Sequence, residues 1–212
     1  FKTRKKNIAI IGGGGHARVI IDTLYELNNN CLSTDYNIIG YFDDNVNKKY
    51  RNINKIGNIQ DIKNIDNDTF YICGIGNLSI RKKIISILDK VNWINVIHPS
   101  AIISKTVSLE KGIFINANVV INSQAIIKNH AIINTNSIIE HDVLIKQNCH
   151  IAPGVTICGH VTIKENSFIG CGTNIINKNK HGFITIGKNN FINAGSLILH
   201  SSKDNSKIKG IY

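Results

Sequence analysis

Isoleucine recurs at every sixth residue through the second half of the chain. Counting in steps of six from Ile97 to Ile175, thirteen of the fourteen positions are isoleucine and the exception is Leu109. Four residues after each of these positions stands a mostly small or β-branched residue, such as Ala101 or Val143. A period of six fits neither an amphipathic helix nor a half-buried strand. We therefore predict a parallel β-helix, in which each hexad supplies one short strand and one corner.

In such a β-helix, about three hexads form one triangular coil. The isoleucines would fill the interior, and stacked coils would share a continuous core. The frame is interrupted after Ile175 and resumes at Ile186, eleven residues later instead of twelve. We predict that the segment Asn177–Gly182 leaves one corner as a loop, which is either a functional loop or a tolerated insertion.

The first half has a different pattern, in which short apolar runs alternate with amphipathic segments. This alternation is typical of a small Rossmann-like parallel sheet with right-handed crossovers. We assign it to residues 1–96 and the β-helix to residues 97–212. The predicted strands cover residues 7–11, 38–42, 70–76 and 93–97, and the predicted helices cover 17–27 and 78–89.

Two features of this first half are candidates for ligand binding. Gly12, Gly14 and Ala17 form a Gly-x-Gly-x-x-Ala turn that follows a strand and opens a helix, which is the context of a phosphate-binding turn. Asp43 and Asp44 follow the second strand, at the edge where ligands bind such sheets, and the alternative is that they are plain turn residues. The domain is short for a dinucleotide fold, so we favour a mononucleotide or a nucleotide sugar.

Composition narrows the classes of partner. The 25 basic and 14 acidic residues give a net charge of +11, which favours an anionic ligand. A single Trp and the lack of an aromatic–basic platform argue against nucleic acid. No apolar stretch is long enough to predict a membrane span. The five cysteines form no C-x-x-C motif, which favours a reducing cytoplasm. Because Met is absent, we expect a sequence trimmed at its N-terminus.

A glycine-turn α/β domain followed by a hexapeptide β-helix resembles the NeuD/PglD family of bacterial sugar acyltransferases. The matching motifs are Gly12–His16, Asp43-Asp44, Gly74–Asn77, Ile80–Lys83, Ile97–Ala101, Ile139–Asp142, His150–Gly154 and Cys158-Gly159. The resemblance implies a left-handed β-helix, a homotrimer with active sites between neighbouring β-helices, acetyl-CoA as co-substrate and no metal. It is nearest to the acetyltransferases of UDP-4-amino sugars and related nucleotide sugars.

The resemblance also implies roles for individual residues. His141 would be the general base, oriented by Asp142, and Asn134 would lie near the acceptor amine. His150 and Gly159 would contact the acetyl thioester. Ala194 and Gly195 would contact the cofactor. The residues implied to contact the nucleotide sugar are Gly14, Gly15, His16, Asp43, Asp44 and Asn77.

The hexad frame adds an independent argument about these residues. His141 stands two residues after Ile139 at an outward corner, and Gly159 stands one coil later. Imidazole suits a base that works near neutral pH, and a bare glycine N–H suits an oxyanion donor. His150 is nine residues from His141, or half a coil, so we expect it to reach the same site only across a subunit interface.

The resemblance, together with the corner position of His141, implies an acetyl-CoA-dependent N-acetyltransferase. Its acceptor would be the 4-amino group of a nucleotide-linked 4-amino-4,6-dideoxy sugar, and its product would feed bacterial surface glycan synthesis. Three alternatives stay open. The first is a sialic acid, or related sugar, O-acetyltransferase. The second is a metal enzyme like the γ-class carbonic anhydrases, with His141, His150 and His160 as ligands. The third is a non-catalytic solenoid that only binds.

Overall fold

The computed structural model describes residues 5–30, 36–64, 68–88 and 90–212. Asp89, the last residue of the second predicted helix, lies outside these ranges. Internal contacts divide the chain into two compact units, Phe1–Pro99 and Ser100–Tyr212. None of the helices in the described ranges combines the length and the apolar character that a membrane-spanning helix needs.

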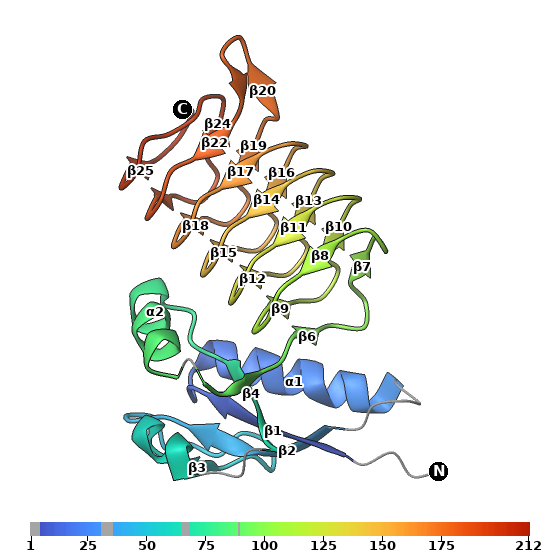
Figure 1. The fold of residues 1–212 in the computed structure, drawn as a ribbon, viewed down its shortest axis with the longest axis vertical. Helices are drawn as coiled ribbons and strands as arrows, with labels where there is room; N and C mark the ends of the chain where they lie inside the picture. The colour runs from blue at the N-terminus through green and yellow to red at the C-terminus, as the bar shows by residue number, and fades with distance from the viewer. Residues whose placement is uncertain (1–4, 31–35, 65–67, 89) are drawn as a thin grey trace. The chain divides into compact units, whose positions relative to one another are not determined.

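The first unit is a parallel sheet in the order β3-β2-β1-β4-β5 (Figure 1). Its strands are β1 (Lys6–Ile11), β2 (Tyr36–Phe42), β3 (Lys55–Gly57), β4 (Phe70–Cys73) and β5 (Asn92–Trp93). Its helices are α1 (Gly15–Asn30), the 3₁₀ helix η1 (Ile59–Asn64) and α2 (Leu78–Ile87), and the short strand β6 (Val96–Ile97) ends the unit. Because the chain moves to one side of β1 to form β2 and to the other side to form β4, a topological switch point lies beside β1.

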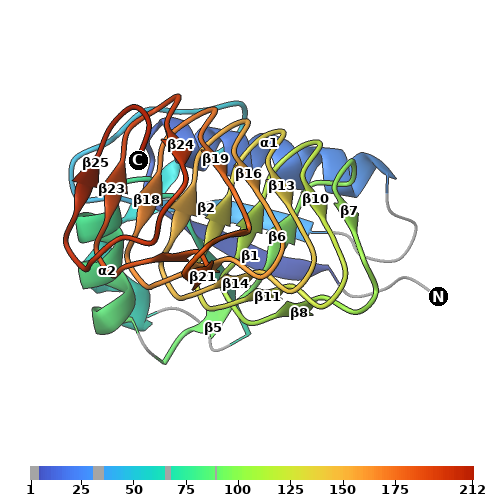
Figure 2. The ribbon, with the colours of Figure 1, turned by 90° about the horizontal axis from the view of Figure 1, so that it is seen from above.

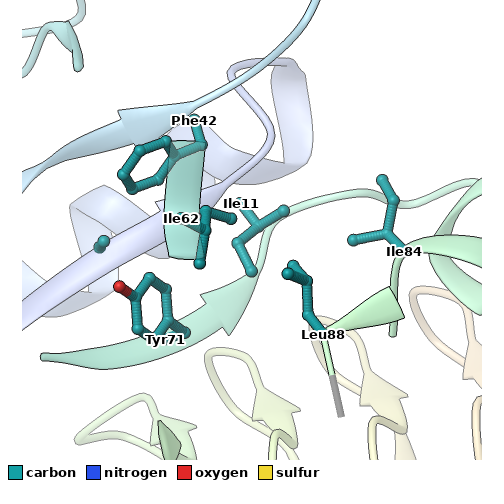
Figure 3. Close-up of a cluster of buried hydrophobic side chains, with 7 residues drawn as sticks. Ile11, Phe42, Ile62, Tyr71, Ile84 and Leu88 are labelled. Atoms are coloured by element: carbon teal, nitrogen blue, oxygen red, sulfur yellow. The ribbon is translucent and has the colours of Figure 1, made fainter. Parts of the chain in front are cut away.

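Burial of apolar side chains explains why these elements form. Figure 3 shows a cluster drawn from strands, η1 and α2, whose members are Ala9, Ile11, Phe42, Ile62, Tyr71, Ile84 and Leu88. Helix α1 approaches the sheet closely, since a Cβ on Gly74 would lie 2.7 Å from the Cβ of Ala17. Glycine at position 74 is therefore a requirement of the packing between α1 and β4.

The α/β prediction is confirmed, with differences in detail. The third predicted strand ends at Cys73 instead of continuing to Gly76, because the chain turns away once the Gly74 N–H has bonded to the Ile11 carbonyl at 2.7 Å. The last predicted strand is split into β5 and β6. Strand β3 and helix η1 were not predicted, since their residues carry no clear apolar period.

The second unit is the predicted left-handed parallel β-helix (Figure 2). One sheet contains β7 (Ile102–Ile103), β10 (Val120–Ile121), β13 (Ile138–Ile139), β16 (Thr156–Ile157), β19 (Asn174–Ile175) and β24 (Leu197–Ile198). The second contains β8 (Ser108–Leu109), β11 (Ile126–Ile127), β14 (Leu144–Ile145), β17 (Thr162–Ile163) and β22 (Thr185–Ile186). The third contains β9 (Phe114–Ile115), β12 (Ile132–Ile133), β15 (His150–Ile151), β18 (Phe168–Ile169), β23 (Phe191–Ile192) and β25 (Lys207–Ile208).

The hexad isoleucines form the interior as expected. Ile133 pairs with Ile151 one coil later, and both are fully buried, as is Ile139 on the neighbouring sheet. Non-glycine residues occupy the left-handed region at several corners, including Asp142 with φ of 59° and His160 with φ of 63°. Asn, Asp and His tolerate this region better than most residues, so the corner composition fits the geometry.

The interruption of the hexad frame forms a hairpin. Ile163 pairs with Ile186, so this coil has 23 residues where the coil between Ile145 and Ile163 has 18. The additional residues form the antiparallel strands β20 (Lys178–Asn179) and β21 (Gly182–Phe183), which project from the stack of coils (Figure 1). Register is recovered immediately afterwards, so the predicted loop of Asn177–Gly182 is present as an ordered excursion.

Candidate active site

A cavity of about 310 Å³ opens at the carboxyl ends of β1, β2 and β4. The predicted nucleotide-site residues that line it are Gly14, Gly15, His16, Asp43 and Asp44. The first N–H groups of α1 lack intrahelical carbonyl partners, and they give this edge of the sheet a positive partial charge. The cavity is therefore suited to phosphate, at the switch point where parallel sheets bind ligands.

Asp43 organises the loop beside this cavity. Its Oδ2 accepts from the Gly13 N–H at 2.8 Å, and its Oδ1 accepts from the N–H groups of Asn45 and Val46 at 2.8 and 2.7 Å. Partial burial acts to raise the pKa of Asp43, but the backbone donors of Val46, Asn45 and Gly13 outweigh it and hold the pKa below the ordinary 3.8. Asp43 thus connects the glycine turn to the end of β2 as a carboxylate.

This contact predicts a pH-dependent contribution to stability. Replacing Asp43 by Asn removes the Gly13 bond and should lower the free energy of unfolding at pH 7 by about 1–2 kcal/mol, less than for a fully buried group because the side chain is partly exposed. Because the pKa is depressed in the fold, this stabilisation is present above pH 3.8 and is lost as pH falls below that value. Urea denaturation of both proteins between pH 3 and pH 7 measures the difference. A difference that stays constant across the range would contradict the prediction.

A second cavity of about 650 Å³ adjoins the first and shares Asp44, Ile59, Ile80 and Ile84 with it. Lys83 on α2 lines this larger cavity. Asn77 has a structural role, since its Oδ1 accepts from the Ile80 N–H at 3.0 Å and caps α2. Asn77 is not among the residues that line the described cavities, so its contact to a nucleotide sugar stays a prediction.

In the β-helix, His141 and Asp142 form a close pair at the corner between β13 and β14. The Nδ1 of His141 lies 2.8 Å from the Oδ2 of Asp142. A carboxylate can only accept, so Nδ1 carries the proton and Nε2 is the basic nitrogen. The His141 side chain is 52% exposed and the Asp142 side chain 42%. The pair can therefore meet a ligand from solvent.

Gly159 lies against the His141 ring, one coil further along. A Cβ added to Gly159 would lie 2.6 Å from Cε1 and 2.7 Å from Nε2 of His141. The glycine is thus required for the imidazole to rest where it does, a reason that differs from the oxyanion role inferred from sequence. Both reasons can hold, since one concerns the missing side chain and the other the backbone N–H.

Two aromatic rings lie beside this pair, and the sequence indicated His160 only as a candidate metal ligand and gave no role to Phe183. The ring of His160 meets the His141 ring edge-on, with centroids 5.2 Å apart. The ring of Phe183, on the hairpin, stacks on His160 at 4.5 Å and an interplanar angle of 30°. Only the break in the hexad frame indicated that an added segment could reach this corner.

His150 and Asn134 lie together on a different sheet from His141. The Nε2 of His150 lies 3.5 Å from the Nδ2 of Asn134, and the ring of His150 meets the edge of Phe168 with centroids 5.2 Å apart. Phe168 stacks in turn on Phe191 at 4.9 Å. The half-coil separation from His141 is therefore present, and an aromatic column continues from His150 along the outside of this sheet.

The column ends at a cavity of about 460 Å³ that is lined by Phe191, Asn193, Lys207, Ile208 and Lys209. Ala194 and Gly195 follow in an exposed turn. The Gly195 N–H already donates to the Cys171 carbonyl at 2.8 Å, so a cofactor contact at Gly195 would use its carbonyl. The two lysines and the aromatic face together suit a ligand with an extended apolar arm and phosphate groups.

The imidazoles proposed as metal ligands are not all brought together. Among the described residues, the group with metal-ligand geometry is His141, Asp142 and His160, whose ligand atoms lie within 4.8 Å of one another. His150 is not part of it. Because the Oδ2 of Asp142 and the Nδ1 of His141 are already at hydrogen-bonding distance, the arrangement fits a proton-bearing pair better than a coordination sphere.

Known proteins resemble the chain in both units. Residues 7–88 match the family described as the PglD N-terminal domain. The UDP-N-acetylbacillosamine N-acetyltransferase of Bacillus subtilis (strain 168) is 32% identical over 115 residues, a match that covers 50% of this chain and 50% of that protein. The chain spans at most half the length of the curated relatives it matches, 20% of one and 50% of the other.

Several solved structures match nearly the whole chain, among them two with bound ligands. The acetyltransferase domain of PglB from Neisseria gonorrhoeae FA1090, in complex with acetyl coenzyme A, has a TM-score of 0.88 and 25% identity over 98% of this chain and 97% of that one. PerB from Caulobacter crescentus, in complex with CoA and GDP-perosamine, has a TM-score of 0.81 and 26% identity over 96% of this chain and 94% of that one.

Proposed function

We propose that this chain is a member of the NeuD/PglD family of sugar acyltransferases and an acetyl-CoA-dependent N-acetyltransferase, which the match of residues 7–88 and the similarity to the PglB acetyltransferase domain support. The proposed acceptor is the 4-amino group of a nucleotide-linked 4-amino-4,6-dideoxy sugar. The contact between His141 and Asp142 carries the proposal, because it leaves Nε2 as the basic nitrogen of a half-exposed imidazole at a corner of the β-helix. Similarity to one structure that binds acetyl coenzyme A and another that binds CoA and GDP-perosamine supports the choice of substrates.

In the proposed reaction, His141 acts as general base. Its Nε2 takes the proton that the acceptor amine loses when its nitrogen attacks the thioester carbon. Asp142 holds the ring in the Nδ1–H tautomer and stabilises the imidazolium that forms. The N–H of Gly159 is the candidate donor to the oxygen that gains negative charge. The thiolate of CoA then leaves, so no covalent intermediate with the protein forms.

Acetyl-CoA would supply the activated acetyl group as a thioester. The aromatic column from His150 to Phe191 suits the pantetheine arm, and Lys207 and Lys209 suit the phosphates of the nucleotide end. The nucleotide of the acceptor would occupy the cavities at the carboxyl edge of the first unit, beside the N-terminus of α1.

A homotrimer is part of the proposal. The outward positions of the first three strands of one sheet are apolar, namely Ile102, Val120 and Ile138, and Ile102 is 68% exposed. An exposed apolar face of this kind is typical of a protein–protein contact. In a trimer built on such faces, His150 of one subunit could serve the base of its neighbour. We also place the reaction in the cytoplasm, which fits the free thiols of Cys73, Cys158 and Cys171.

A thiol-release assay with a panel of acceptors tests the proposal. The purified protein is incubated with acetyl-CoA and with 4-amino-4,6-dideoxy sugars linked to UDP, dTDP or GDP, and free sialic acid is the opposing substrate. We expect release of CoA with at least one nucleotide amino sugar, and mass spectrometry should find the acetyl group as an amide. Activity on sialic acid alone would instead support the O-acetyltransferase alternative and overturn the proposal.

A further inference from the structure

We propose that His160 is a positioning residue that holds the His141–Asp142 pair in its basic tautomer, and that Phe183 of the β20–β21 hairpin holds His160. The inference rests on the proposed function for its catalytic consequence, although the contacts that carry it do not depend on that function. The hairpin thereby has a function, whereas the hexad pattern left open whether this segment is functional or a tolerated insertion.

The His141 ring needs support because it is half exposed. An exposed side chain loses rotamer freedom when it is held in one orientation. The structure provides contacts on three sides, with the Asp142 carboxylate at Nδ1, the Gly159 backbone beneath the ring and the His160 ring edge-on. Removal of His160 would open one of these sides to rotation about χ2. That rotation puts Cδ2 in the place of Nδ1, so the ring loses the contact to Asp142 that favours the Nδ1–H tautomer.

His160 also faces the carboxylate that orients the base. Its Nε2 lies 3.9 Å from the Oδ2 of Asp142, the same oxygen that the Nδ1 of His141 contacts. The separation is too long for a hydrogen bond but short enough for electrostatic attraction when His160 is protonated. Two imidazoles therefore face one carboxylate oxygen, which restricts the Asp142 side chain to the rotamer that serves His141.

Phe183 in turn fixes His160, whose side chain is 42% exposed. The rings of His160 and Phe183 are stacked with centroids 4.5 Å apart. Phe183 is 52% exposed and belongs to β21, a strand that exists because this coil contains 23 residues. The added segment thus places an aromatic ring at the corner that holds the candidate base.

Imidazole NMR tests the inference directly. Long-range ¹H–¹⁵N correlation spectra show which ring nitrogen carries the proton, and a His141→Ala spectrum assigns the His141 signals. In the intact protein we expect neutral His141 to be mainly the Nδ1–H tautomer. His160→Asn, chosen because Asn tolerates the left-handed corner, should shift His141 toward the Nε2–H tautomer that exposed histidines ordinarily favour. Phe183→Leu should produce the same shift, and Phe183→Tyr, which keeps the ring, should not.

Steady-state kinetics provides the second measurement. For His160→Asn and Phe183→Leu we expect kcat to fall about tenfold, as a small misplacement of a catalytic group requires, with both KM values nearly unchanged. His181→Asn is the matched control, because it removes an exposed imidazole from the same hairpin, and it should change neither measurement.

The two measurements separate the possible failures. An unchanged His141 tautomer in His160→Asn overturns the inference, whatever happens to the rate. If instead the intact protein transfers no acetyl group to any acceptor, the proposed function fails, while the tautomer shift still decides whether His160 positions His141. Circular dichroism of each variant confirms that a tautomer change does not come from unfolding.

Discussion

Replacing His141 by Ala should lower kcat for acetyl transfer by about 10²- to 10⁴-fold, the range that loss of a general base usually costs. The variant loses Nε2 of His141, the nitrogen that is proposed to take the proton of the attacking amine. Stability should change little, because the side chain is 52% exposed and its interior neighbours on the hexad frame are untouched. A coupled thiol-release assay at saturating acetyl-CoA measures the loss.

Asp142→Asn is the shape-matched companion to this variant. Asn fits the same left-handed corner, where Asp142 has φ of 59°. Its amide group can donate to Nδ1 of His141, which favours the Nε2–H tautomer and leaves Nε2 without a lone pair to accept a proton. We therefore expect a loss approaching that of His141→Ala. If both variants kept full activity, the pair would not be the base of the reaction.

Gly159→Ala should lower kcat by about 100-fold, as expected when a catalytic group is displaced by roughly 1 Å. The new Cβ would lie 2.6 Å from Cε1 of His141, a separation that side-chain atoms cannot keep. An exposed imidazole can swing away into solvent, so the protein relieves the overlap by moving the base rather than the coil. We therefore expect the melting temperature to change little while activity falls.

Ser123→Ala is the control for this substitution. Ser123 occupies the equivalent corner position one coil before His141, and its carbonyl accepts from the Asp142 N–H at 3.0 Å. The backbone contact survives the change, so activity should stay near the original value. If Gly159→Ala retained full activity, contact with Gly159 would not be what holds His141 in place.

The hexad pattern predicted the β-helix because its cause is local and repeated. One isoleucine in six must fill the interior, and stacked coils repeat that demand, so the period could be counted along the chain. The corner position of His141 and its proximity to Gly159 followed from the same count. The structure confirms both placements, since the missing Cβ of Gly159 adjoins the His141 ring.

Other contacts could not be predicted, because they depend on the path of segments that lack a period. The partnership of His160 and Phe183 requires the hairpin to fold back over the corner. A count of residues shows only that a segment has been added. Likewise, nothing in the sequence around Asn77 distinguishes a helix cap from a ligand contact, and the structure uses its side chain as a cap.

The coils return to register immediately after the hairpin. Holding the base in place and shaping the surface beside it are therefore tasks of different segments, although many active sites combine them. Ile163 pairs with Ile186 in the same parallel register that Ile145 and Ile163 have without an insertion. The packing of the interior therefore does not depend on how many residues the excursion contains. The hairpin beside the candidate base can therefore be lengthened, shortened or exchanged without altering the coils that hold the base. Related chains could change acceptor preference at this corner while they keep the same catalytic chemistry.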